Sequence, residues 1–149
     1  MELTMSTRTD ARLITFNNLA VRFQDEAYTL AYYLLGDENR AAETTQDAFA
    51  RLYQRAGLRL DKFRLEIFRW VLAHAHSRSG VLSRATARDE LSRDLLRLNE
   101  RERSVVVLID VMGLSYDEAA EVLDCSKKQV GQLLALARIH FSHSTQAVH

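Results

Sequence analysis

Residues 99–141 read NERERSVVVLIDVMGLSYDEAAEVLDCSKKQVGQLLALARIHF and contain three short helical patterns in succession. Each pattern opens on a small polar residue and carries Glu or Gln three positions later. The three pairs are Asn99 with Glu102, Ser115 with Glu118, and Ser126 with Gln129. In such a capping box the first side chain accepts a hydrogen bond from a free backbone N–H, and the second reaches back to the first residue. Three boxes in register predict a compact unit of three helices.

The last two helices are separated only by residues 123–126. This length is typical of the turn in a helix-turn-helix, whose second helix lies in the DNA major groove. The same stretch carries, in order, Leu98, Arg101, Glu102, Arg103, Val105, Leu108, Gly113, Leu114, Ser115, Tyr116, Glu118, Ala119 and Leu123. That succession resembles the phrase L-x-x-R-E-R-x-V-x-x-L, followed by G-L-S-Y-x-E-x-A-x-x-L, of bacterial extracytoplasmic-function (ECF) sigma factors. The resemblance implies a C-terminal DNA-binding domain of the sigma type.

Composition predicts an all-α protein. The 149 residues include no proline and only five glycines, so the turn residues expected of sheets and hairpins are scarce. No apolar run approaches the ~18–20 residues that cross a bilayer, and the N-terminus lacks the pattern of a secretory signal. The one cysteine, Cys125, has no partner for an internal disulfide, which favours a reducing cytoplasm. We therefore expect a cytoplasmic protein without membrane contact.

The N-terminal part predicts helices over residues 11–35, 37–57 and 61–76, with residues 1–10 frayed. Gly36 can end the first helix in the left-handed conformation, and Asp37 can cap the second. This region carries Gly36, Asp37, Ala41, Glu43, Gln46, Asp47, Phe49, Leu52 and Tyr53. These residues resemble the ECF pattern G-D-x-x-x-A-E-D-x-x-Q-E-x-F-x-x-L-W. The resemblance implies a domain over residues 11–79 that binds the clamp helices of RNA polymerase through Glu43, Gln46 and Asp47.

Residues 80–87 are the predicted linker to the helix-turn-helix domain, residues 88–142. A helix from about residue 86 to residue 98 is expected to lead into that domain. Such a short connector favours two small domains packed together. In the ECF sigma factors that this chain resembles, the corresponding region is a strongly basic segment that melts promoter DNA. Here the arginines are dispersed among acids, and aromatic stacking residues are lacking.

No catalytic centre, cofactor or metal site is expected, so we do not expect the chain to be an enzyme. Gly-rich phosphate loops and the G-x-S-x-G and H-E-x-x-H motifs are missing from the sequence. His74 and His76 would point about 200° apart on a helix. His140 and His143 have no acidic or cysteine ligand nearby in sequence, whereas structural zinc takes four ligands. His74 is predicted to be a hydrogen-bonded core residue, and Cys125 a small buried residue of the turn.

The expected reading helix follows Ser126, and its candidate DNA-binding residues are Lys127, Lys128, Gln129, Gln132 and Arg138. The family pattern there resembles S-x-x-x-V-K-S-R-L-x-R-A-R, and this chain departs from it at Gly131, Leu133 and Leu136. Residues 99–141 hold five basic and seven acidic side chains, although DNA-binding domains usually show a basic excess. The leucines that replace family cations predict a helix that is largely buried.

The sequence leaves two functions open. In the first, the chain is an ECF-type sigma factor that directs the RNA polymerase core to promoters, with promoter DNA binding weakened by the lost cations. In the second, it is a divergent sigma-like protein that acts through protein–protein contacts. Its partner would then be an anti-sigma factor, polymerase or a second copy of the chain in a homodimer. A helical bundle that keeps the fold without either function is a third reading.

Overall fold

The computed structural model describes residues 2–55, 59–78 and 87–146, and the side chains of residues 11–55, 59–78 and 87–142. All regular secondary structure in these ranges is helical, as predicted. The α-helices are α1 (Glu2–Leu35), α2 (Glu38–Gln54), α3 (Phe63–Arg78), α4 (Glu90–Leu95), α5 (Glu100–Val106), α6 (Tyr116–Leu123) and α7 (Lys127–Gln146). A 3-10 turn, η1 (Leu60–Lys62), precedes α3, and a π-helical segment, η3 (Val107–Val111), continues α5.

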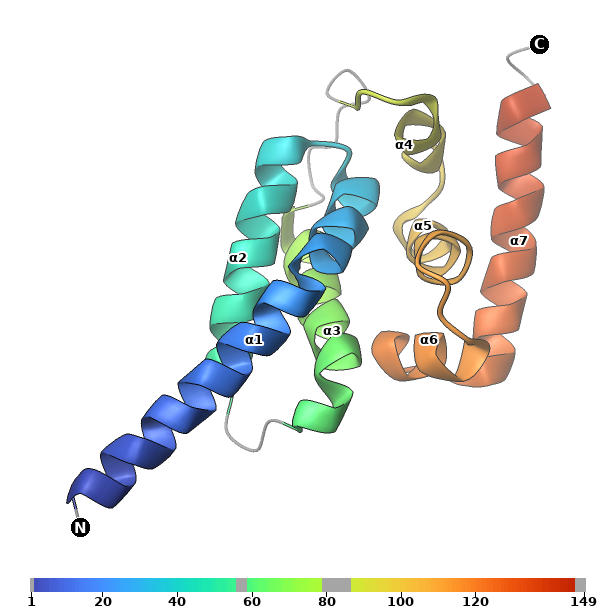
Figure 1. Ribbon diagram of the computed structural model, residues 1–149. Coiled ribbons are helices and arrows are strands. Elements are labelled where there is room, and N and C mark those ends of the chain that lie inside the picture. Colours follow the sequence, from blue (N-terminus) through green and yellow to red (C-terminus); the bar gives the residue numbers. More distant parts are fainter. Residues whose placement is uncertain (1, 56–58, 79–86, 147–149) are drawn as a thin grey trace.

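The helices form two groups that pack against each other (Figure 1). The N-terminal unit consists of α1, α2 and α3, and the C-terminal unit consists of α4 to α7. The first turns of α1 project beyond α2 and α3, so the N-terminus lies far from the C-terminal unit (Figure 1). The predicted linker falls almost wholly on residues 79–86, which lie outside the described residues.

Local sequence explains where α2 begins. Gly36 takes a left-handed backbone conformation with φ of 68°, which ends α1. The Asp37 side chain then accepts a hydrogen bond from the backbone N–H of Arg40 at 2.9 Å. Both roles were predicted, and both are confirmed.

Several predicted boundaries were wrong. The first helix begins at Glu2 rather than residue 11. Once a helix is nucleated, each residue added to its end gains one hydrogen bond, so the helix can extend beyond the apolar pattern. The second helix stops at Gln54, and residue 57, its predicted end, lies outside the described residues. The third continues to Arg78.

The helix expected from about residue 86 is much shorter than predicted. It is α4, which starts only after Asp89 and ends at Leu95. The Asp89 carboxylate accepts from the backbone N–H of Ser92 at 2.6 Å and from the Tyr32 hydroxyl at 3.1 Å. This capped start, held against α1, sets the beginning of the helix.

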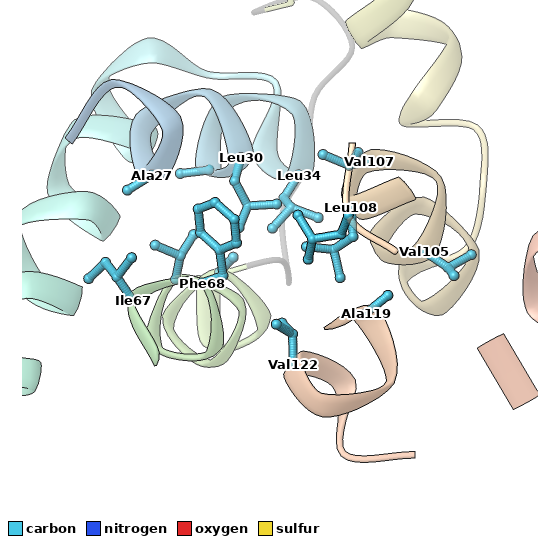
Figure 2. Close-up of a cluster of buried hydrophobic side chains, with 14 of the residues drawn as sticks. Ala27, Leu30, Leu34, Ile67, Phe68, Val105, Val107, Leu108, Ala119 and Val122 are labelled. Atoms are coloured by element: carbon cyan, nitrogen blue, oxygen red, sulfur yellow. The ribbon is translucent and has the colours of Figure 1, made fainter. Parts of the chain in front are cut away.

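One hydrophobic core runs through both units (Figure 2). Leu30 and Leu34 of α1 and Phe68 of α3 face Leu108 of η3 and Val122 of α6. All of these side chains are buried. Because the two units share this apolar contact, the compact arrangement favoured by a short connector is the one observed.

Polar contacts also join the units. Arg64 of α3 donates to both carboxylate oxygens of Glu26 on α1, each at 3.0 Å, and to the Met112 carbonyl oxygen at 3.3 Å. Lys62 lies 2.8 Å from Glu121 of α6. These contacts join the two units beside their shared apolar interface.

Candidate DNA-binding and polymerase-binding surfaces

The helix-turn-helix predicted from the capping boxes is present as α6, a short turn and α7. Ser115 and Glu118 exchange reciprocal hydrogen bonds of 3.1 and 3.0 Å at the start of α6. Ser126 and Gln129 do the same at the start of α7, at 3.1 and 2.9 Å. Asp124 takes the left-handed conformation, with φ of 55°, which lets the chain reverse between the two helices.

The backbone N–H of Ser115 lowers the pKa of the Glu118 carboxyl by hydrogen bonding to its charged form. The box therefore prefers an ionised Glu118. Asn99 and Glu102 complete the third predicted box at the start of α5, so all three are confirmed.

Three of the five predicted DNA-binding residues are already engaged within the chain. Lys127 lies 3.7 Å from the Asp117 carboxylate, and Arg138 donates to Asp110 at 2.8 Å. That hydrogen bond raises the pKa of Arg138. The amide oxygen of Gln129 accepts from the backbone of its own capping box. All three side chains are nevertheless exposed, and each keeps N–H donors that these contacts do not use.

The other two predicted residues lie free on the surface of α7. Lys128 and Gln132 are exposed, and neither makes a side-chain contact with another residue in the part of the chain that the structure describes. They are four positions apart, so they lie on one face of the helix.

The prediction that α7 is largely buried was wrong. Val130, Leu134 and Ala137 are buried in the core, and Leu133 and Phe141 pack against it half-buried. Leu136 and Ile139 keep 50% and 52% of their surface exposed. The reason is that α7 lies at the edge of the C-terminal unit and covers α5 and α6 with one side only. The side of α7 that carries Leu136 and Ile139 therefore faces solvent.

The surroundings of α7 are acidic. Asp117 and Glu118 lie in the first turn of α6, and Asp124 lies in the turn between the helices; Asp117 and Asp124 are exposed, and Glu118 is half-buried. An acidic neighbourhood opposes phosphate contacts, which provide most of the non-specific affinity for DNA. The charge deficit seen in the sequence thus persists on the folded surface.

The predicted polymerase-binding residues share one exposed face of α2. Glu43, Gln46 and Asp47 are spaced at i, i+3 and i+4 and are exposed. The opposite face buries Ala41, Thr44, Thr45, Ala48 and Leu52. Both threonines therefore serve packing rather than the exposed face.

Beside this face lies a cleft that sequence reasoning missed. It has a volume of about 480 Å³ and runs between α1 and α2. Its lining is largely apolar, with Leu13, Phe16, Phe49 and Tyr53, and Gln46 stands on its rim. Leu13 and Phe16 come from α1, whose apolar pattern indicates helix packing but not which positions stay uncovered.

Arg103 has a different role from the one its charge indicates. It is buried and donates to the carbonyl oxygens of Leu95 at 3.1 Å, Leu34 at 3.1 Å and Leu98 at 2.9 Å. Burial lowers the pKa of its guanidinium. Of the five basic residues counted in the helix-turn-helix region, this one faces the core and cannot meet DNA.

The remaining predicted side chains do not assemble into a reactive centre. In the described residues, no three His, Cys, Asp or Glu side chains are grouped as a metal site. His74 stacks near Trp70, but its Nε2 atom is buried without a hydrogen-bond partner, so the expected hydrogen bond at that atom is not formed. Cys125 is half-buried against the core, and a cleft of about 390 Å³ between α3 and the C-terminal unit reaches it.

Comparison with known proteins agrees with this geometry. The family described as "Sigma-70, region 4" matches residues 88–141. A solved structure of CnrH in complex with the cytosolic domain of CnrY superposes with a TM-score of 0.79 and 28% identity, covering 89% of this chain and 88% of CnrH. Residues 88–141 match the sigma-70 region 4 family, and nearly the whole chain has the fold of CnrH.

Two further relatives bear on this chain. RNA polymerase sigma factor YlaC of Bacillus subtilis (strain 168) is 38% identical over 58 residues, which are 39% of this chain and 34% of YlaC. The match therefore spans about a third of the length of YlaC. The sigma factor RpoE of Bartonella quintana, solved with the anti-sigma factor NepR, has a TM-score of 0.70 at 16% identity over 88% of this chain and 96% of RpoE. That likeness is one of fold. None of the described helices has the length and apolar character needed to cross a membrane.

Proposed function

We propose that this chain is an initiation factor that binds the RNA polymerase core and directs it to promoters. It would act in the cytoplasm, by binding rather than catalysis. The observation that carries the proposal is the likeness of almost the whole chain to CnrH, with the helix-turn-helix inside the matched sigma region. The N-terminal unit would dock on polymerase and α7 would enter the upstream promoter element.

The exposed face of α2 supports the first half of this proposal. Glu43 and Asp47 place two carboxylates one helical turn apart with Gln46 beside them. Reversing both charges, Glu43→Lys with Asp47→Lys, is expected to weaken binding to purified core polymerase at least tenfold, measured by fluorescence anisotropy. Charge reversal at a complementary contact costs several kcal/mol.

The matched control is Asp25→Lys, an exposed acid on α1 away from that face. It should bind core as the parent chain does. Equal affinity of the double variant and the control would show that α2 does not carry the docking surface.

The reading helix supports the second half. Lys127→Glu with Lys128→Glu places two acids at the start of α7 and should abolish transcription from a promoter that the holoenzyme recognises, because like charges would face the phosphates. Binding to core should stay intact. Unchanged transcription by this variant would contradict promoter reading by α7.

A second candidate function is favoured by the half-exposed Leu136 and Ile139 on α7, together with the internally paired Lys127 and Arg138. In this alternative the chain occupies polymerase or another protein without reading DNA. Mixed with core and a different sigma factor, it would then reduce that factor's transcription and produce no start sites of its own. Start sites that depend on the chain would exclude the alternative.

A further inference from the structure

The exposed face of α7 has an unusual composition for a helix that enters DNA. Along one side it presents Lys128, Gln132, Ala135, Leu136 and Ile139, all exposed. This face holds one cation, one amide and three apolar side chains. The other polar side chains near its start, Lys127 and Gln129, are also exposed but make the contacts with the chain described above.

The major groove offers partners that match this composition. Glutamine forms a bidentate pair with adenine, in which its amide N–H donates to N7 and its amide oxygen accepts from the N6 amino group. Apolar side chains contact the C5-methyl group of thymine. Guanine is recognised by Arg or Lys, and on this face only Lys128 has that chemistry. Three of the five positions are therefore suited to the methyl group, which only thymine carries.

Spacing supports simultaneous contact. Gln132 and Leu136 are four residues apart, which is about 6 Å along the helix axis. Successive base pairs are about 3.4 Å apart. A helix lying along the groove would thus place the two side chains over base pairs one or two steps apart.

We propose that α7 selects adenine–thymine pairs in the upstream promoter element, with Gln132 on an adenine and Leu136 against a thymine methyl group. The inference rests on the proposed function, since it requires α7 to enter promoter DNA. It adds to that function by assigning sequence selection to an amide and a leucine instead of cations. It also assigns the exposed Leu136 to a DNA contact and not to a protein contact.

The test begins with holoenzyme assembled from this chain and core polymerase. DNA whose upstream element is randomised is selected on the holoenzyme, and the selected element is resynthesised with each thymine in turn replaced by deoxyuridine. This change removes only the methyl group. At the contacted thymine, affinity should fall about fourfold, the value of one buried methyl-sized group.

Two variants connect the effect to its side chains. With Leu136→Ala, the element carrying thymine and the element carrying deoxyuridine should bind equally well. With Gln132→Ala, discrimination between adenine and other bases at one position should fall about tenfold. Leu91→Ala is the control and should keep the full effect of deoxyuridine, because Leu91 lies on α4 and is 40% exposed, against 50% for Leu136.

Each outcome decides a separate point. If the holoenzyme retains no DNA beyond what core retains alone, the proposed function fails. If DNA is retained and deoxyuridine changes nothing at any position, or if the methyl effect persists in Leu136→Ala, the inference fails while the function stands. If Leu136→Ala weakens binding to thymine DNA and to deoxyuridine DNA by the same factor, so that the preference for thymine remains, the leucine lies in a protein contact and the inference is also overturned.

Discussion

Arg103 shows how a charged residue can hold two units together from inside the core. Its guanidinium reaches the last turn of α1 through the Leu34 carbonyl oxygen and the end of α4 through Leu95 and Leu98. Carbonyl groups at a helix C-terminus lack intrahelical partners, and a cation there is favoured by the helix dipole. The arginine therefore supplies a charged donor to carbonyl oxygens at the ends of two helices, although the Leu95 oxygen also accepts from the backbone N–H of Leu98.

Arg103→Ala is expected to lower the free energy of unfolding by about 3 kcal/mol or more, since three buried carbonyl oxygens lose a charged donor. Urea denaturation followed by circular dichroism would measure it. Arg101→Ala, two residues away and exposed, should change stability by no more than about 0.5 kcal/mol. Equal effects of the two substitutions would mean that the buried contacts contribute nothing particular.

The sequence could not show this difference between Arg101 and Arg103. Both arginines occur in the same family phrase, and both have the same charge. Which one is buried depends on the approach of α1, 69 positions earlier in the chain at Leu34. In the same way, the sequence identified Lys127 and Arg138 as cations but not the acids, Asp117 and Asp110, that hold them.

At the scale of the single helix, the glycines at positions 36 and 131 have opposite roles. Gly36 has a positive φ, and an added Cβ would meet the Leu96 side chain at 2.6 Å. Gly131 lies within α7, where an added Cβ would meet Tyr116 at an ordinary contact distance of 3.7 Å. Only the first position needs glycine for its backbone.

Gly131→Ala should therefore raise the melting temperature, stabilising the chain by about 0.5–1 kcal/mol through helix propensity. Gly36→Ala should lower it, because the left-handed conformation costs about 1–2 kcal/mol for a residue with Cβ. Differential scanning fluorimetry of the two variants checks both signs. A destabilised Gly131→Ala would show that α7 requires the glycine for some other reason.

The capping box of α6 makes stability depend on pH. Glu118 has a folded-state pKa below its ordinary value of 4.5. Its contribution is fully present above the unfolded-state pKa and is lost as pH falls through the lowered one. In the Glu118→Gln variant, the free energy of unfolding should therefore fall less steeply as the pH drops below about 4.5. Urea midpoints measured from pH 6 to pH 3 give this slope. The comparison variant is Glu43→Gln, which changes an exposed acid on α2. If both variants lost stability in the same way at acid pH, the capping box would not be the cause of the pH dependence.

Helices with strong local signals were predictable, and those set by tertiary contacts were not. The three capping boxes and the Gly36–Asp37 junction depend on neighbouring residues, so the sequence located them correctly. The short α4 begins where Asp89 meets Tyr32 of α1, a contact between distant segments. The exposed side of α7 was missed because helical periodicity shows which residues share a face, not whether a neighbour covers it.

At the scale of the molecule, the shared core makes the two units one cooperative structure. Leu52 belongs to the N-terminal unit, and Leu108 belongs to η3, the segment that contacts the N-terminal unit. Both side chains are completely buried. Leu52→Ala and Leu108→Ala should each cost about 2–5 kcal/mol. Each should shift the same transition, with calorimetric and van't Hoff enthalpies remaining equal. Two separate transitions in either variant would show that the units fold independently.

The balance of charge also belongs to the whole molecule. Twenty basic and twenty acidic residues give no net charge, and the helix-turn-helix surface is acidic around α7. Long-range attraction to DNA is therefore weak, and under the proposed function the affinity for promoters would depend on polymerase. We expect the chain alone to bind duplex DNA poorly and the holoenzyme to bind it well.

Transcription start sites mapped on genomic DNA test the central claim most directly. Core RNA polymerase from the organism that encodes this chain would be incubated with and without the purified chain, and the 5′ ends of the transcripts sequenced. The account predicts a set of discrete start sites that appear only with the chain and disappear with Lys127→Glu plus Lys128→Glu. Folded chain that binds core but yields no new start sites would contradict it.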